Sequence, residues 1–131
     1  MAGIERGLLI LLGIETVDDR EDADWLAVKI SKLRLFADAA GLMNLSITEV
    51  DGGLLVVSQF TLHASTKKGN RPSFIRAARP EHAIPLYEYF VQVLERESQR
   101  TVSTGKFGAD MQVELINDGP VTVWIDSRQR E

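Results

Sequence analysis

The sequence contains no cysteine and no long apolar run, and each absence excludes several classes of protein. Without cysteine the chain can form no disulfide, no thiolate zinc site and no cysteine nucleophile, which fits a cytoplasmic protein. The longest apolar run, residues 8–12, is far too short to span a bilayer. Residues 1–6 lack the charged-then-apolar layout of a signal peptide. We therefore expect a cytoplasmic, globular protein with no membrane partner.

Acidic residues outnumber basic residues, which gives a net charge of −4 at pH 7. The protein as a whole therefore does not attract nucleic acid. The charges are unevenly distributed, however, because residues 67–79 hold five basic and no acidic residues, whereas acids crowd into residues 18–24. A basic island on an acidic protein is a candidate for phosphate contact, and a solvated loop is the alternative. The basic residues of the island are Lys67, Lys68, Arg71, Arg76 and Arg79.

The length of 131 residues suits one compact domain, and we expect residues 1–131 to form it. Strand-like and helix-like apolar runs alternate early in the chain and strand-like runs follow one another late, which predicts a mixed α/β fold. We expect a mixed β-sheet or partial barrel with two main helices. The expected strands are residues 7–14, 35–36, 54–62, 111–116 and 121–126, and the expected helices are residues 23–33 and 80–97.

The same patterns predict details of three elements. Residues 7–14 are apolar on both faces and bracketed by glycines, which is typical of a central strand buried on two sides. Asp22 is the expected N-cap of the first helix, because acids are favoured there by the helix dipole. The second helix should turn a buried stripe to the core. That stripe consists of Leu86, Phe90, Val93 and Leu94.

Few residues that carry chemistry stand at a recognisable spacing. The two histidines, His63 and His82, have no partner at metal-ligand spacing, so we predict no metal site. A triad of Ser58, His63 and Asp110 could be drawn, but the spacing does not select it and the glycine-flanked nucleophile elbow is absent. A lone histidine is more often a surface or packing residue.

Polar residues appear abruptly at the end of the strand expected at residues 54–62. The C-terminal end of a buried strand is a common place for a functional site. Thr61 could be a nucleophile only if something activates it, whereas Gln59 and the local backbone amides could donate to a developing oxyanion. The alternative is a strand that simply leaves the core. The polar loop that follows, residues 64–74, has a length that is usually functional or disordered.

A glycine-proline pair, Gly119-Pro120, stands between two apolar runs that look buried. An ordinary hairpin would use Asn-Gly or Asp-Gly and continue its ladder, whereas proline has no N–H to give to a sheet. Either this segment is only a turn, or its backbone is shaped for a task.

Four segments, taken in order, closely resemble the D-aminoacyl-tRNA deacylase family. They are SQFTL at residues 58–62, KGNRPSF at 68–74, FGADM at 107–111 and NDGPVT at 117–122, within a match that runs over residues 7–127. The resemblance implies hydrolysis of the ester that joins a D-amino acid, or glycine, to the terminal ribose of tRNA, including glycine mischarged on tRNA-Ala. It also implies a homodimer that works without a metal or other cofactor.

The resemblance assigns roles to the catalytic segment and to the glycine-proline pair. Gly119-Pro120 is similar to the family's cis Gly-Pro, which enters the active site of the neighbouring subunit and blocks the space that an L side chain needs. A rigid backbone filter rejects by clash and tolerates many amino acids. For the attack itself, either Thr61 is the nucleophile or the tRNA's own 2′-OH assists water, and we favour the second. The catalytic segment is Ser58, Gln59, Phe60 and Thr61.

Contacts with the aminoacylated 3′ end of tRNA are implied in the same way. Aromatic residues would bind the terminal adenosine, and basic residues would meet phosphates. The implied substrate-binding residues are Phe74, Phe107, Met111, Asn117 and Thr122, and the implied phosphate contacts are Lys67, Lys68 and Arg71.

The sequence departs from the family pattern at its start. Family members begin with a strand carrying Gln-Arg-Val and a hairpin, roughly twenty residues by ordinary strand and hairpin lengths. This segment should precede Gly7, and residues 1–6 do not carry it. We expect an unpaired sheet edge and a less firmly held Gly-Pro element. The alternative function is therefore a tRNA-end-binding or protein-binding member of the family with impaired catalysis.

Overall fold

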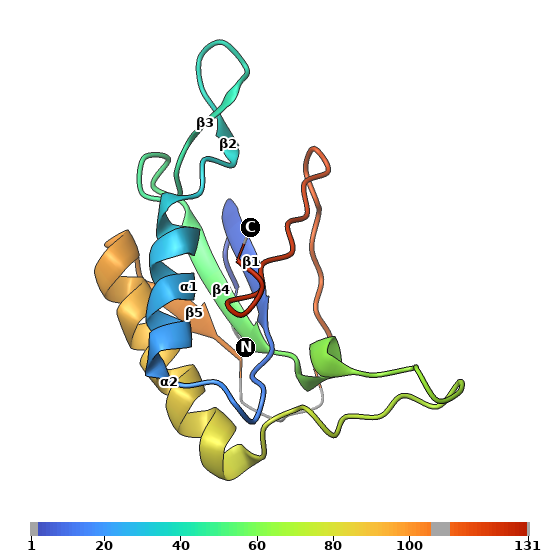
Figure 1. Cartoon of the computed structure of the whole chain (residues 1–131). Coiled ribbons are helices and arrows are strands. Elements are labelled where there is room, and N and C mark those ends of the chain that lie inside the picture. The colour runs from blue at the N-terminus through green and yellow to red at the C-terminus, as the bar shows by residue number, and fades with distance from the viewer. Residues whose placement is uncertain (1–2, 106–110, 131) are drawn as a thin grey trace.

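The computed structural model describes residues 3–105 and 111–130, and it has the mixed α/β architecture with two main helices that the sequence predicts (Figure 1). In chain order the elements are β1 (Gly7–Leu12), α1 (Arg20–Lys32), β2 (Phe36–Ala37), β3 (Met43–Leu45), β4 (Gly53–Ser58), the 3-10 helix η1 (Phe60–His63), α2 (Pro80–Ser98) and β5 (Val102–Thr104).

The main sheet is parallel, with strand order β1-β4-β5. Parallel neighbours need long crossover connections, and α1 and α2 lie in those two connections. Antiparallel pairing between named strands is confined to the short β2–β3 hairpin. The register places Leu8 beside Leu54 and Leu12 beside Ser58, so β1 and β4 end at the same edge of the sheet. No helix among the described residues is long and apolar enough to cross a membrane.

The core lies between the sheet and the two helices, which pack against each other on one side of it (Figure 1). The stripe predicted for α2 is confirmed, because all four of its residues are buried. Ala27 and Ile30 of α1 and Leu54 and Val56 of β4 complete the centre of this core. Burial of such side chains stabilises by roughly 1.5–3 kcal/mol each.

Two predictions about strands need correction at this sheet. Among the described residues β1 pairs only with β4 and is half-buried, so it is an edge strand rather than a central strand buried on both faces. The strand predicted at residues 54–62 ends at Ser58. The Gln59 amide donates to the Leu12 carbonyl at 2.8 Å, where β1 ends, and the chain then turns into η1.

The N-cap prediction for α1 is wrong by three positions. The helix is capped by Asp19, whose carboxylate accepts from the Glu21 and Asp22 amides at 3.0 and 3.4 Å. Asp22 completes a capping box by accepting from the Asp19 amide at 3.0 Å. Because the acidic run offers several carboxylates at capping distance, residue type alone does not select the correct one.

The last two predicted strands are also wrong, and β5 was not predicted. Residues 111–124, which we call the arm, have no strand partner among the described residues (Figure 1). A strand needs a neighbouring backbone to bond with, and here the apolar pattern is present without one. The arm's side chains are correspondingly exposed, to 93% at Ile116 and 68% at Trp124.

Candidate functional site

The segment predicted to be catalytic lies at the C-terminal end of β4, in and just before η1. Ser58 ends the strand, and Gln59 precedes the 3-10 helix that carries Phe60 and Thr61. The Gln59 side-chain amide donates to the Thr61 hydroxyl oxygen. An amide N–H cannot take up a proton, so this contact orients the exposed Thr61 hydroxyl without activating it as a nucleophile.

Two exposed phenylalanines meet beside this segment. Phe60 and Phe74 are 57% and 38% exposed, and their rings pack edge to face with centroids 4.9 Å apart and planes at 70°. Such a pair is favourable by roughly 0.5–1.5 kcal/mol beyond its buried area. The structure thus brings a residue of the catalytic segment together with one predicted to bind adenosine, and it leaves aromatic surface open to solvent.

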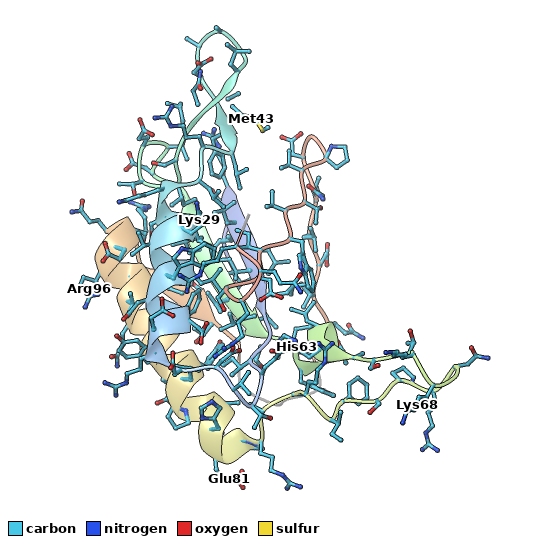
Figure 2. All side chains as sticks on the ribbon, viewed as in Figure 1. Lys29, Met43, His63, Lys68, Glu81 and Arg96 are labelled. Atoms are coloured by element: carbon cyan, nitrogen blue, oxygen red, sulfur yellow. The ribbon has the colours of Figure 1, made fainter. Side chains whose placement is uncertain are left out.

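The predicted phosphate contacts lie on a projecting loop with a defined neck. Ser65 and Ser73 exchange backbone hydrogen bonds of 2.7 and 2.8 Å, which close residues 66–72 into what we call the basic loop. The loop extends away from the body of the protein, as Lys68 shows in Figure 2. Among the described residues no carboxylate pairs with its basic side chains, which remain available to an anion. These side chains are Lys67, Lys68 and Arg71.

A cluster of side-chain contacts around Glu15, which the sequence pattern did not reveal, holds η1 to the rest of the site. The Glu15 carboxylate lies 3.1 Å from Nδ1 of His63 and 3.5 Å from the Arg76 guanidinium. Nε2 of His63 packs so closely on Gly13 that a Cβ there would stand 2.9 Å away. His63 is therefore a packing residue, as its isolation in the sequence suggested. Glu15, which follows β1, thus joins η1 to the segment after the basic loop, and no sequence pattern links these parts of the chain.

The glycine-proline pair forms the tip of the arm, and its peptide bond is cis. The Asn117 side-chain carbonyl oxygen accepts from the Val121 amide at 2.9 Å, and its side-chain amide donates to the Thr122 hydroxyl at 2.8 Å. Gly119 has a φ of 137°, and a Cβ there would lie 2.8 Å from a methyl group of Val121. Asn117 and Thr122 thus close the turn around the pair, and only glycine fits at position 119.

The predicted site residues fall into two separate groups within one chain. The first contains η1, Phe74 and the basic loop, and the second is the turn at the tip of the arm. The tip lies far from η1, at the opposite end of the arm (Figure 1). Met111 belongs to neither group, because it is half-buried at the base of the arm, close to Gly105. Phe107 and Asp110 lie outside the described residues.

The acids at the start of α1 are engaged in structural contacts. Carboxylate oxygens of Asp19, Glu21 and Asp22 lie within 4.8 Å of one another, a spacing that could suit a cation. Asp19 caps the helix, Glu21 pairs with Arg130 at 2.9 Å, and Asp22 pairs with Arg128 at 3.0 Å. Burial alone would raise the pKa of Asp22, but the Asp19 amide, the Ser127 hydroxyl and Arg128 outweigh it and lower that pKa.

Solved structures share this arrangement of elements. The structure of a protein named "c-Myc DNA Unwinding Element Binding Protein" superposes with a TM-score of 0.84 at 39% identity, covering 92% of this chain and 81% of that one. A probable eukaryotic D-amino acid tRNA deacylase superposes with a TM-score of 0.69 over 82% of this chain and 77% of its own. At 14% identity, this second match indicates a shared fold alone.

Two relatives have a higher sequence identity to this chain than these solved structures have. The D-aminoacyl-tRNA deacylase of Flavobacterium johnsoniae is 60% identical over 130 residues, which are 99% of this chain and 87% of the relative. That of Akkermansia muciniphila is 66% identical over 125 residues, which are 95% of this chain and 83% of the relative. The family model described as D-Tyr-tRNA(Tyr) deacylase matches residues 1–126. The chain therefore belongs to the D-Tyr-tRNA(Tyr) deacylase family.

Proposed function

We propose that this protein hydrolyses the ester joining a D-amino acid to the 3′-terminal ribose of tRNA, and so removes D-amino acids from the translation machinery in the cytoplasm. Glycyl esters, including glycine mischarged on tRNA-Ala, are substrates as well. The observation that carries the proposal is the 60% identity, over 99% of this chain, to a D-aminoacyl-tRNA deacylase. Residues 1–131 act as a single deacylase domain.

In the proposed reaction, water adds to the ester carbonyl, the bond to the ribose 3′ oxygen breaks, and that oxygen takes a proton. The tRNA's own 2′-OH assists the water, while η1 holds the ester. The Gln59 contact with Thr61 supports this division of work, because it supplies orientation and no base. Backbone amides at the start of η1 stabilise the oxyanion. The step uses no metal or other cofactor.

Selection against L esters is assigned to Gly119-Pro120 acting in a second copy of the chain. The separation of the arm tip from η1 within one chain supports this homodimer (Figure 1). So does the exposure of Ile116 and Trp124, since an apolar surface of this kind is usually covered by a partner. The rigid Gly119-Pro120 backbone would lie against the α-carbon of the esterified amino acid. There it would clash with an L side chain but leave room for a D side chain or for the hydrogen atom of glycine.

The tRNA end is bound by the first group of residues. Lys67, Lys68 and Arg71 contact phosphates, and the Phe60–Phe74 pair offers a face on which the terminal adenine stacks. A second candidate, binding of DNA, is raised by the 39% identity to the c-Myc DNA unwinding element binding protein, and exposed aromatic rings favour a single strand. The same basic loop and aromatic pair would suit either single strand.

The test is release of D-tyrosine from D-tyrosyl-tRNA by this chain, with L-tyrosyl-tRNA as the parallel substrate and the oligomeric state measured in the same sample. We expect rapid D-ester hydrolysis by a dimer and little L-ester hydrolysis. A folded dimer that releases neither amino acid, yet binds a single-stranded DNA oligonucleotide tightly, would contradict the proposal and support the second candidate.

The role of Thr61 is tested in the same assay with Thr61→Ala. Loss of one orienting hydrogen bond should lower kcat only about tenfold, whereas loss of a covalent nucleophile costs on the order of 10⁴-fold or more. Thr101→Ala, at an exposed threonine between α2 and β5, is the control. A Thr61→Ala protein that is folded, binds tRNA and has no measurable activity would contradict assistance by the substrate 2′-OH.

A further inference from the structure

The chain that follows the arm is fastened to the start of α1 by three polar residues, which we call the C-terminal anchor: Ser127, Arg128 and Arg130. Just before it, Ile125 packs against the core. The Ser127 hydroxyl then donates to the Asp22 carboxylate at 2.9 Å. The arm's C-terminal end is therefore fixed to the body of the protein within a few residues of Trp124.

Arg128 makes the central contacts of the anchor. Its Nε donates to Asp18 at 3.1 Å, and its Nη2 donates to Asp22 at 3.0 Å and to the Val17 carbonyl. The side chains of Asp18 and Asp22 are only 12% and 9% exposed, while Arg128 is 43% exposed. Pairs shielded from water in this way are less screened than ordinary surface pairs and hold a more defined geometry.

Arg130 adds a second set of contacts on the same helix. Its guanidinium pairs with Glu21 at 2.9 Å, stacks over the Trp25 ring at 4.5 Å and donates to the Ser127 carbonyl at 2.7 Å. The acidic run at residues 18–24 thus binds residues 127–130. Its carboxylates cap α1 and hold the anchor at once.

We propose that Arg128 is a positioning residue for chiral selection, because it fixes the base of the arm and thereby the direction in which Gly119-Pro120 is presented. This inference rests on the proposed function. Within one chain the arm has no strand partner among the described residues, so the direction in which it meets a second copy depends on how its ends are held. A small rotation at the base becomes a larger displacement at the tip. A displacement of about 1 Å in a reacting site can cost on the order of 100-fold in rate.

The experiment compares Arg128→Gln with Arg128→Lys, and uses Arg96→Gln as the matched control. Arg96 is an exposed arginine on α2, on the side of the molecule away from the arm (Figure 2), and its carboxylate partner Glu97 lies 3.7 Å away. For each dimer we would measure kcat and KM on D-tyrosyl-tRNA, the ratio of D-ester to L-ester hydrolysis, the affinity for uncharged tRNA, and Tm.

For Arg128→Gln we expect kcat on the D ester to fall by roughly 10- to 100-fold and the D/L ratio to fall with it. Affinity for uncharged tRNA should not change, because the basic loop is separate from the anchor. Lysine keeps the charge but has one nitrogen in place of the separate Nε and Nη2 that bond Asp18 and Asp22, so Arg128→Lys should recover part of the loss. A residue that only stabilises the fold would lower Tm and leave the D/L ratio of the folded enzyme unchanged.

Arg128→Gln with the kcat and D/L ratio of Arg96→Gln would overturn the inference while the proposed function stands. If Arg128→Gln does not fold, Arg128→Lys decides: wild-type kcat and D/L ratio in that variant would overturn the inference. An inactive wild-type chain would overturn both the proposed function and this inference.

Discussion

Replacing Gly119 with alanine tests whether the backbone of the turn performs the selection. Gly119 has a φ of 137°, a conformation that L residues other than glycine rarely adopt. The new Cβ would also stand 2.8 Å from a Val121 methyl group and 3.2 Å from the Val121 amide nitrogen. Rotation of the Val121 side chain can relieve the first contact, but the second contact is with backbone. The alanine variant must therefore adopt a different turn.

Two energetic costs, one in the backbone at residue 119 and one in the Val121 side chain, determine how far Gly119→Ala depopulates the native turn. An unfavourable backbone conformation costs about 1–3 kcal/mol, and moving Val121 away from its preferred rotamer adds about 0.5–1.5 kcal/mol. Their sum, roughly 1.5–4.5 kcal/mol, lowers the population of the native turn by roughly 10- to 2000-fold. Because the turn is exposed and outside the core, Tm should hardly change.

The assay is hydrolysis of D-tyrosyl-tRNA and L-tyrosyl-tRNA by the Gly119→Ala dimer. The lower end of the estimated loss of native turn is about tenfold, so we expect kcat/KM on the D ester to fall by about tenfold or more. The D/L ratio should fall as well. Gly41→Ala is the matched control, because Gly41 also has a positive φ, 81°, but sits in the β2–β3 turn with no atom near its added Cβ. If Gly119→Ala matches Gly41→Ala in rate and D/L ratio, the geometry of this turn does not perform the selection.

Two further predictions follow from contacts in the same structure. Asn117→Ala removes both side-chain bonds that close the turn. We expect roughly a tenfold lower kcat with KM unchanged, since about 1–1.5 kcal/mol of turn stability is lost; a raised KM with normal kcat would instead indicate direct substrate binding. Asp22→Asn should lower stability at pH 7 by about 1–3 kcal/mol. The pKa of Asp22 is lowered in the folded protein, so the stabilisation by its carboxylate is present at pH values above the pKa of the unfolded chain, about 3.9. This stabilisation is lost as pH falls through the pKa of the folded protein. The Tm difference between Asp22→Asn and wild type should therefore be constant above about pH 5 and shrink from about pH 4 downward; a constant difference to about pH 2 would refute the assigned contacts.

Elements whose structure depends on local pattern were predictable from the sequence. The spacing of Leu86, Phe90, Val93 and Leu94 matches one helical face, and all four residues are buried in α2. Asp38 and Gly41 are residue types that favour turns, and the Gly41 amide donates to the Asp38 carbonyl at 3.0 Å. In each case residues close together in the sequence are enough to indicate the local conformation.

Elements that depend on a distant partner were predicted wrongly or missed. Residues 111–116 and 121–126 have strand-like composition, but no described backbone lies beside them to form a ladder. The three residues of β5 were missed because a strand so short has no recognisable period. The contacts of Glu15 with His63 and of Arg128 with Asp18 join residues far apart in the chain. Sequence spacing carries no information about such pairs.

The separation of the two groups of site residues has a consequence for how this family could change during evolution. On the proposed function, η1 and the basic loop determine whether the ester is bound and cleaved, whereas the arm determines which ester is rejected. The two groups are held by different contacts, Glu15 for η1 and the C-terminal anchor for the arm. Substitutions at Glu15 should therefore change the rates for D and glycyl esters in parallel. Substitutions in the anchor should lower the D-ester rate and the D/L ratio together, so only substitutions around η1 are expected to change rate without changing stereoselectivity.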